Sequence, residues 1–248
     1  MDILQLSGKG IISLIGAGGK TSLMFQLAKE IVQSERKVLT TTTTKIFMPQ
    51  PYQSPDTVVE NDYDKLLKKV RSNLNKFSHF SAGSKYDKGS NKLKGFTPAI
   101  IHKLWMEKLF DWIIVEADGA RQKPIKASNQ YEPVVPKKTT HLILVAGLDA
   151  VGKILDDKYV HRPKIFSDNT GLAMGKILTE QAIAKAIAIE IEKSRQLCQS
   201  KLNIVFLNKA DILDQKASGL NITNLLKTDT IIDKIITASL KDNVVITN

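Results

Sequence analysis

The chain has 248 residues, of which 42% are hydrophobic and 25% are charged, a balance typical of a globular protein in water. This length can bury a sizeable core, and one domain over residues 1–248 is the simplest organisation. No apolar run approaches the ~20 residues of a membrane-spanning helix, and the first residues lack the basic and apolar regions of a secretory signal. We therefore expect no membrane association and a cytoplasmic location.

The net charge is strongly positive, at +11, yet the sequence does not indicate a nucleic-acid-binding protein. Such a charge attracts anionic partners in general. However, only five basic residues are arginine, and the lysines are scattered without the interleaved aromatic residues of an RNA or DNA contact surface. We expect most lysines to be solvated and disfavour nucleic acid as a partner. The single cysteine, Cys198, fits a reducing compartment.

Strand and helix signals alternate along the chain. Apolar or β-branched stretches predict strands, and apolar residues at helical spacing predict helices. In chain order we predict a strand over 10–16, a helix over 20–35, a strand over 37–43, a helix over 62–74, a hairpin of 76–83 with 92–96, a helix over 97–110, apolar strand segments within 111–119 and 140–150, a helix over 179–197, a strand segment within 202–211 and an edge strand over 243–247. Thr97 and Thr179 are suitable N-caps for their helices.

The apolar strands lack the polar alternation of a half-exposed sheet. They must therefore be buried on both faces, with the intervening helices as cover. This pattern predicts an α/β fold with a mostly parallel sheet flanked by helices. In such sheets ligands bind at the carboxyl ends of the strands, so the motifs at those ends are the candidates for function.

A glycine-rich turn connects the first strand to the first helix. Its residues are Gly16, Ala17, Gly18, Gly19, Lys20, Thr21 and Ser22. Glycines let successive amides point towards phosphate oxygens, and the helix N-terminus adds positive potential. We expect Lys20 to reach the β- and γ-phosphates and Thr21 to bind Mg²⁺. The turn predicts a P-loop NTPase-like three-layer sandwich, although it is the shorter G-x-x-G-K-[ST], with Leu14 where the usual pattern has glycine; a turn that binds nothing is the alternative.

Two acids, Glu116 and Asp118, stand at the end of the strand within 111–119. A carboxylate in that position can hold Mg²⁺ through water or position an attacking water molecule. We therefore predict Lys20, Glu116 and Asp118 as catalytic residues and Glu116 as a Mg²⁺ site. The spacing E-x-x-G resembles the second acidic motif of GTPases related to metal-insertion chaperones. The alternative is a loop with solvated acids.

The segment Asn208-Lys209-Ala210-Asp211 has the pattern N-K-x-D at the end of a late strand. In GTPases this tetrapeptide recognises guanine: the aspartate accepts hydrogen bonds from the ring N–H and the exocyclic amine, and the lysine stem packs along the base. Adenine would leave that buried carboxylate unpaired. We predict that Asn208, Lys209 and Asp211 bind the base. The alternative is that Asp211 caps the helix that follows.

Five consecutive threonines, Thr40–Thr44, precede Lys45. Threonine is a good strand former, and alternate residues of a strand point to opposite faces. We expect the first of them to pack by their methyl groups. Thr43 and Thr44 lie at the end of the strand, so we predict that their hydroxyls approach Mg²⁺ or the γ-phosphate.

The motifs occur together in an order that resembles the YqeC family. The resemblance rests on the segments IGAGGKTSLM, VLTTTTTKIFMP, VEADGARQKPIKA, EPVVP, AGLDAVGK, VHRP and LNKAD. It extends from about Ile11 to Asp211, with Ser22 and Ser128 where threonine and proline are expected. The family is similar to P-loop NTPases of the metallochaperone and signal-recognition-particle class. Its members are described as accessory proteins of selenium-dependent molybdenum hydroxylases.

The matched segments also suggest a second ligand that is anionic. A molybdopterin-type cofactor carries phosphates, and oxyanions of selenium or molybdenum are negative; planar arginine suits such groups. The residues assigned to this ligand are Lys45, Arg121, Lys123, Lys126, Asp149, His161 and Arg162. No His/Cys cluster has metal-ligand spacing, which disfavours a permanent zinc or iron site.

The resemblance and the motifs together imply a nucleoside triphosphatase that binds Mg²⁺ with GTP or ATP. Its role would be maturation or cofactor insertion for a molybdenum hydroxylase, which would be its protein partner. Two alternatives stay open. The loop G-x-x-G-K-T also resembles that of Mur-type ligases, which favours an ATP-dependent ligase or kinase. The third reading is a non-catalytic binding protein switched by GTP.

Overall fold

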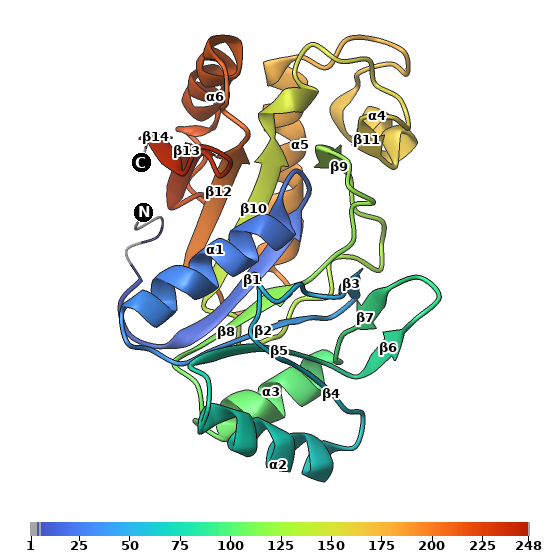
Figure 1. Ribbon diagram of the computed structural model, residues 1–248. Helices are drawn as coiled ribbons and strands as arrows, with labels where there is room; N and C mark the ends of the chain where they lie inside the picture. The colour runs from blue at the N-terminus through green and yellow to red at the C-terminus, as the bar shows by residue number, and fades with distance from the viewer. Residues whose placement is uncertain (1–3, 5, 248) are drawn as a thin grey trace.

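The computed structural model describes residue 4 and residues 6–247, and a nine-stranded sheet forms its centre (Figure 1). In spatial order the strands are β14 (Val244–Thr247), β13 (Lys234–Ser239), β12 (Leu202–Asn208), β10 (His141–Gly147), β1 (Gly10–Gly16), β8 (Trp112–Glu116), β2 (Val38–Thr42), β5 (His79–Gly83) and β4 (Thr57–Val59). Within the described residues, β13 and β14 form the one antiparallel pair of this sheet. The mostly parallel sheet and its edge strand confirm the predicted fold class.

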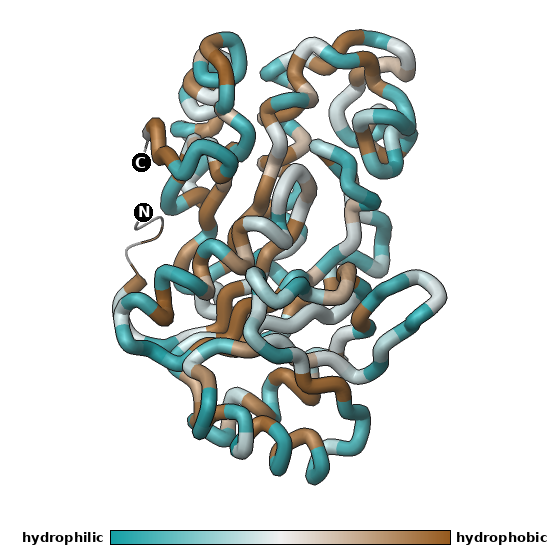
Figure 2. The backbone as a smooth tube through the Cα atoms, in the orientation of Figure 1, coloured by the Kyte–Doolittle hydropathy of each residue, from teal (hydrophilic) through white to brown (hydrophobic). Residues whose placement is uncertain are grey.

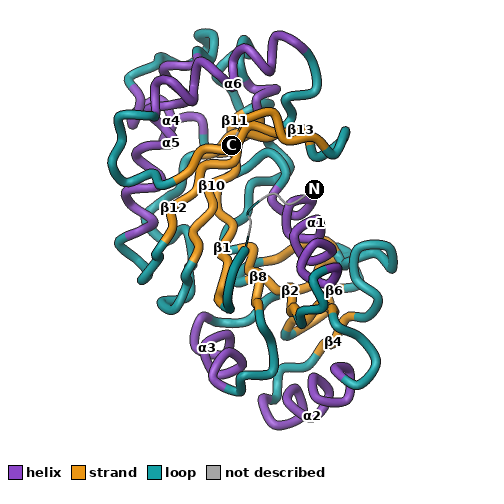
Figure 3. The backbone as a smooth tube through the Cα atoms, turned by 90° about the vertical axis from the view of Figure 1, so that its left-hand side faces the viewer, coloured by secondary structure: helices purple, strands orange, loops and turns teal. Residues whose placement is uncertain are grey.

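Five helices cover the sheet and bury both of its faces. They are α1 (Lys20–Gln33), α2 (Tyr63–Leu74), α3 (Pro98–Met106), α5 (Glu180–Arg195) and α6 (Leu213–Leu226). Figure 3 shows α1 on one side of the sheet and α3 and α5 on the other. The helices and the sheet between them form three layers, the arrangement that the alternation of strands and helices predicts.

Strand β1 shows why the sequence requires this arrangement. All seven of its residues are buried, and successive side chains point to opposite faces. Ile12 and Leu14 belong to the hydrophobic cluster under α1, whereas Ile11 and Ile15 belong to clusters on the other face. Each such side chain contributes about 1.5–3 kcal/mol when it is removed from water. In Figure 2 the central strands are mostly brown and the outer helices carry teal.

Two predicted helix starts are confirmed in their hydrogen bonds. The Thr97 hydroxyl accepts a hydrogen bond from the amide of Ile100 at the start of α3, and the Thr179 hydroxyl accepts one from Ala182 at the start of α5. Helix α1 differs, because its N-cap is Gly19, which has no side chain to accept from the first turn. The amide end of α1 is therefore left for another partner.

The smaller elements flank the carboxyl edge of the main sheet. A three-stranded antiparallel sheet contains β3 (Lys45–Phe47), β7 (Lys92–Lys94) and β6 (Lys85–Asp87), and a two-stranded one contains β9 (Ile125–Lys126) and β11 (Val160–His161). A short 3₁₀ helix spans Leu148–Ala150, and α4 spans Pro163–Thr170.

The predicted hairpin of 76–83 with 92–96 is wrong in its first strand. Residues 79–83 form β5, which pairs in parallel with β2 in the main sheet. The hairpin partner of Lys92–Lys94 is the shorter strand Lys85–Asp87. Burial explains the difference: Phe80 and Ala82 are fully buried between layers, a position that a solvent-exposed hairpin does not provide.

Because β1, β2, β8, β10 and β12 run parallel, their carboxyl ends meet at one edge of the sheet. The glycine-rich turn, Glu116, the end of the threonine run and Asn208 all lie at that edge. Among the described residues, we find no helix with the length and apolar character needed to cross a bilayer.

Candidate functional site

The glycine-rich turn between β1 and α1 adopts conformations that only glycine tolerates. Gly16, Gly18 and Gly19 have φ angles of 88°, 80° and 130°. A Cβ added at Gly16 would lie 2.3 Å from the Val145 carbonyl oxygen, and one added at Gly19 would lie 2.3 Å from the Asn208 amide nitrogen. The turn is therefore held tightly between β1, β10 and β12, and any side chain at these glycines would displace it.

The amides of this turn are used differently from the prediction. Gly16 donates to the carboxylate of Asp118 at 2.8 Å, Ala17 to the Val145 carbonyl at 2.8 Å and Gly18 to the Lys123 carbonyl at 3.1 Å. These three amides hold the turn in place and do not form an open anion cage. The amides available to an anion are those of residues 19–22, which precede the first intrahelical bond, from Leu23 to Gly19.

Lys20 is buried beneath the start of α1 between two carboxylates. Its Nζ lies 2.9 Å from Asp118 Oδ1 and 4.0 Å from Glu116 Oε1, and it also donates to the Gly16 carbonyl. Burial by itself favours the neutral amine, but the charges of Asp118 and Glu116 outweigh it and raise the pKa of Lys20. Lys20 is thus a fixed ammonium group directly below the amide end of the helix.

Thr21 and Glu116 form a pair of oxygen groups next to Lys20. The Thr21 hydroxyl donates to Glu116 Oε2 at 2.7 Å. Burial raises the pKa of Glu116, opposed by the nearby charge of Lys20. A hydroxyl and a carboxylate are ligands that Mg²⁺ prefers. Thr21 and Glu116 are therefore the residues that would hold a Mg²⁺ ion at this position.

Thr43 and Thr44 are not brought to this pair. The Thr43 hydroxyl donates to the Val134 carbonyl at 2.8 Å, and the Thr44 amide donates to the Thr42 hydroxyl at 3.0 Å. The threonine run instead cross-links neighbouring segments, since Thr41 donates to the carbonyl of Ala82 in β5 and Thr42 to that of Glu116 in β8. A hydroxyl that already donates to a carbonyl is a poor metal ligand, which weakens the prediction for Thr43.

A cavity of about 470 Å³ opens above the amide end of α1. Its lining carries a large excess of positive charge, because it includes six basic side chains and a single acid. The acid is Glu116, and the bases are Lys20, Lys45, Lys92, Arg121, Lys123 and Lys209. Such a concentration of positive potential in a concave site favours a polyanionic ligand.

The N-K-x-D segment lies beside this cavity. Asn208 Nδ2 donates to the Gly18 carbonyl at 2.8 Å, which ties the end of β12 to the glycine-rich turn. Asp211 Oδ1 accepts from the Ser239 hydroxyl at 2.7 Å. The N-cap of α6 is Ile212, and Asp211 therefore does not fill the capping position of the alternative reading. Lys209 lines the cavity, and its Nζ lies 2.7 Å from Asp149 Oδ2.

A sequence profile described as "YqeC protein" matches residues 12–164, more than half of the chain. The chain belongs to the YqeC family. It is 39% identical over 162 residues to the "Uncharacterized protein YqeC" of Escherichia coli (strain K12), a match that covers 65% of this chain and 61% of that protein. The matched part thus spans less than two thirds of that relative. The resemblance that the motifs predicted is confirmed.

Solved structures with a similar chain path come from other proteins. Chloroplast FtsY from Physcomitrella patens superposes with a TM-score of 0.47 at 11% identity, covering 94% of this chain and 59% of that chain. Signal recognition particle 54 kDa protein from Aeropyrum pernix K1, a complex with GDP, gives a TM-score of 0.40 at 13% identity, covering 94% of this chain and 42% of that one.

In this YqeC family member, a buried chain of charges continues from Lys20 into the segment after β8. Asp118 is fully buried, and its Oδ2 accepts from both the Gly16 amide and Lys126 Nζ, the latter at 3.0 Å. Lys126 also pairs with Glu132 Oε2 at 2.7 Å, and Glu132 forms a two-pronged ion pair with Arg162 at 2.8 and 2.9 Å. Alternating charges thus connect the P-loop to β9 and α4.

This network occupies residues that were assigned to the second anionic ligand. Lys126 and Arg162 already hold carboxylates, and Asp149 pairs with Lys209. His161 stands opposite Lys126 across β9 and β11, and burial lowers its pKa to about 4, so it is neutral near pH 7. Lys126, Asp149, His161 and Arg162 do not line the cavity. Lys45, Arg121 and Lys123 do, as does Lys209.

Sequence reasoning missed Glu132. The signal available was that Glu132 is the only acid between Asp118 and Asp149, in a stretch with Arg121, Lys123 and Lys126. Phe47 and Lys92 were also missed as site residues; Phe47 lies in the segment VLTTTTTKIFMP without a role assigned to it, and no motif contains Lys92. They reach the cavity only through the pairing of β3 with β7.

The ion pairs of Glu132 predict a specific dependence of stability on pH. Although burial alone would raise its pKa, hydrogen bonds from Arg162 and Lys126 lower the pKa of Glu132 to about 2, from an ordinary 4.5. A carboxylate with a lowered folded-state pKa stabilises the fold above its ordinary pKa, and this contribution is lost as pH falls through the folded-state value. Glu132→Gln should therefore lower the free energy of unfolding at pH 7, and the difference from wild type should shrink between about pH 4.5 and 2.

Urea unfolding of wild type and Glu132→Gln at a series of pH values measures this difference. A gap that stays constant across the acidic interval would mean that Glu132 is not ionised in the folded protein.

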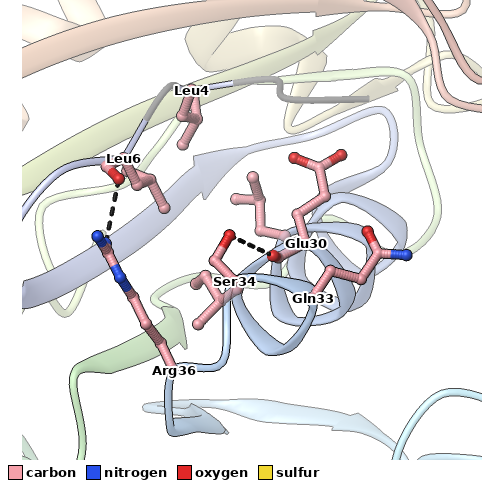
Figure 4. Close-up of a pocket in the computed structure, with 8 residues that line it drawn as sticks. Leu4, Leu6, Glu30, Gln33, Ser34 and Arg36 are labelled. Atoms are coloured by element: carbon pink, nitrogen blue, oxygen red, sulfur yellow. Dashed lines mark hydrogen bonds between the residues drawn. The ribbon is translucent and has the colours of Figure 1, made fainter.

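The chain has a separate cavity of about 250 Å³ near the other end of α1 (Figure 4). Its wall includes Leu4, Leu6 and Arg36, and the Arg36 guanidinium donates to the Leu6 carbonyl at 3.1 Å. The contact joins the first residues of the chain to the turn after α1, which is a structural role. Within the described residues, no group of three or more His, Cys, Asp or Glu side chains has the arrangement of a metal site.

Proposed function

We propose that the cavity above α1 binds a nucleoside triphosphate with Mg²⁺. The observation that carries this proposal is the junction of three features: the uncapped amide end of α1, the buried ammonium of Lys20 and the Thr21–Glu116 oxygen pair. Amides and ammonium neutralise the phosphate oxygens, and the oxygen pair takes the metal that bridges them. No one of these features requires a nucleotide, but their combination in a basic cavity favours one.

The placement of the residues suggests the direction in which the nucleotide lies. Asn208 and Lys209 are at one side of the turn, where they join Gly18 and the cavity wall. Glu116, which accepts from Thr21, ends β8 on the opposite side of β1 from β12. We assign the base to the side of Lys209 and the terminal phosphate to the side of Thr21. Ser22, exposed at the start of α1, lies within reach of the phosphates.

The two predicted catalytic acids receive different roles in this proposal. Glu116 lines the cavity, so it is placed to hold Mg²⁺ or the attacking water. Asp118 is fully buried, with the Gly16 amide and two lysines around it, and has no access to substrate. We therefore assign Asp118 a positioning role through Lys20 and keep Glu116 as the catalytic carboxylate.

Guanine is the base that we propose, and Asp211 is the residue that tests it. The Ser239 hydroxyl holds one of its oxygens at 2.7 Å, which orients the carboxylate for a ligand with two neighbouring donors. Asp211→Asn replaces an acceptor by a donor and should weaken GTP binding about 10- to 100-fold, since a hydrogen bond to a charged group contributes about 1.5–3 kcal/mol. ATP binding should change little.

Calorimetry with Mg²⁺ and each of GTP, ATP and CTP, on wild type and Asp211→Asn, measures this preference. Asp214→Asn, in the first turn of α6, is the matched control. An unchanged ratio of GTP to ATP affinity would reject guanine recognition and favour the ATP-dependent ligase or kinase alternative.

The cellular role that we propose follows the family resemblance: GTP hydrolysis times the maturation or cofactor loading of a selenium-dependent molybdenum hydroxylase. Its support is the order of motifs in the chain and the anionic character of such a cofactor, which suits the basic cavity. Turnover measured with and without the partner hydroxylase tests the role. Hydrolysis that the partner accelerates fits the proposal, and binding without any turnover favours the GTP-switched binding protein.

A further inference from the structure

The small sheet β3–β7–β6 presents an exposed face that is crowded with lysine. Across its three strands, Lys94 stands directly opposite both Lys45 and Lys85. Ile46 and Leu93, the central residues of β3 and β7, are buried on the reverse face. Three ammonium groups therefore share one row on the exposed face.

Such a row destabilises the sheet when nothing opposes it, because residues directly opposite have Cβ atoms about 4.5–5.5 Å apart and like charges repel there. Among the described residues, none of Lys45, Lys85 and Lys94 takes part in an ion pair within 4.0 Å. The acid in the next row, Asp87, stands opposite Lys92 and accepts from the Ser90 hydroxyl at 2.7 Å, and the charge of Lys45 is among the causes that lower its pKa. It is one carboxylate among four lysines of this sheet: Lys45, Lys85, Lys92 and Lys94. The repulsion is relieved if an anion lies against this face.

Part of this face forms a wall of the cavity above α1. Lys45, Phe47 and Lys92 line the cavity together with Arg121 and Lys123. Figure 1 shows the small sheet beside the segment that leads from β8 to β9, which carries Arg121 and Lys123. The cavity thus extends beyond the Thr21–Glu116 pair into a part that the nucleotide phosphates do not require.

An aromatic ring stands among these cations. Phe47 is 51% exposed, and Lys92 Nζ lies over its ring at 5.4 Å from the centroid. A half-exposed phenylalanine on the wall of a polar cavity offers stacking area to a planar group. The lysines and Arg121 beside it offer charge to a phosphate or carboxylate.

We propose that this outer part of the cavity is a subsite for a second small molecule, a planar heteroaromatic compound with a phosphate or carboxylate group. Its ring stacks on Phe47, and its anionic group lies between Lys45, Lys92 and Arg121. The inference rests on the proposed function, because it assigns the space beyond the terminal phosphate. It places the second ligand on the small sheet, away from Lys126, His161 and Arg162.

Flavin mononucleotide is a suitable probe, since it has a planar ring and a phosphate, and the anisotropy of its own fluorescence rises when it binds to a protein. The titration is made with the full chain, with and without a saturating non-hydrolysable GTP analogue and Mg²⁺. We expect binding in both conditions. Phe47→Ala should weaken it about tenfold, the scale of base–aromatic stacking. A Lys45→Ala/Lys92→Ala double variant should weaken it and reduce its salt dependence.

Lys88→Ala, at the exposed tip of the same hairpin and outside the cavity lining, is the control and should bind like wild type. Riboflavin, which lacks the phosphate, should bind more weakly than the mononucleotide and should be insensitive to the double lysine variant. Circular dichroism of each variant excludes a loss of fold as the cause.

Three results would overturn the subsite. The first is equal affinity of wild type and Phe47→Ala for the probe, and the second is complete displacement of the probe by the GTP analogue. The third is a double lysine variant that no longer binds a short DNA duplex but binds the probe like wild type. If the GTP analogue fails to bind while the probe still depends on Phe47 and the lysines, the proposed nucleotide function fails and the subsite stands.

Discussion

Lys20→Met is expected to lower the affinity for Mg²⁺-GTP by about 10- to 100-fold, because charge-assisted hydrogen bonds to phosphate contribute about 1.5–3 kcal/mol. Methionine keeps most of the side-chain volume beneath α1 and removes only the ammonium. Asp118 retains Lys126 at 3.0 Å and the Gly16 amide at 2.8 Å, so the fold should survive with a lower free energy of unfolding, because Lys20 and Asp118 form a buried ion pair. The nucleotide-dependent rise in the thermal midpoint should be lost with the affinity.

Calorimetry with a non-hydrolysable GTP analogue measures the affinity, and circular dichroism checks the fold. The matched control is Lys29→Met, an exposed lysine on the same helix outside the cavity above α1. It removes one positive charge from α1 and should leave the affinity nearly unchanged. Wild-type affinity in folded Lys20→Met would show that the turn does not grip a polyphosphate, and the proposed function would fall.

Asp118→Asn is expected to lower the free energy of unfolding by about 3 kcal/mol or more, the scale for breaking a buried ion pair by removing one partner. Asp118 lies between two lysines whose side chains are 3% and 1% exposed. Removing its charge leaves Lys20 with Glu116 at 4.0 Å and Lys126 with Glu132 as their remaining acids. The carboxylate also accepts from the Gly16 amide, so the glycine-rich turn should loosen as well.

Urea unfolding at pH 7 measures this loss, with Asp157→Asn as the control. Asp157 is exposed, and its replacement should change stability by less than about 0.5 kcal/mol. If Asp118→Asn is as stable as the control, the network does not support the P-loop. If it is destabilised but binds GTP normally once folded, the role of Asp118 is confined to stability and the positioning role is wrong.

Most strands of the main sheet were predictable because their signals are local, whereas β4 and β13 were not predicted. Apolar runs without alternation require burial on both faces. The hydroxyls of Thr97 and Thr179 each accept a hydrogen bond from an amide only three residues further along the chain. The hairpin was predicted wrongly because periodicity distinguishes strand from non-strand but does not choose the partner strand. That choice depended on Phe80, which is buried only if β5 joins the main sheet.

The candidate site was also predictable only in part. Lys20 and Thr21, which follow β1, lie next to Glu116 at the end of β8, since parallel strands bring their carboxyl ends together. The roles assigned to them stay predictions. Thr43 and Asp118 stand at the same edge but turn their polar groups into the protein, to the Val134 carbonyl and to Lys126. Which oxygen faces the cavity depends on hydrogen bonds to segments more than a few residues away.

By itself the sequence determined the family, the parallel sheet, the glycine-rich turn and the residues at the sheet edge, because each depends on hydrophobic pattern, backbone freedom or motif order. Only the tertiary structure decided which charged side chains pair with one another and which line the cavity. It placed Lys126 and Arg162 in ion pairs with Glu132. It also brought Phe47 and Lys92 to the cavity through strand pairing. Pairing of distant groups reflects three-dimensional proximity, and no local pattern in the chain encodes it.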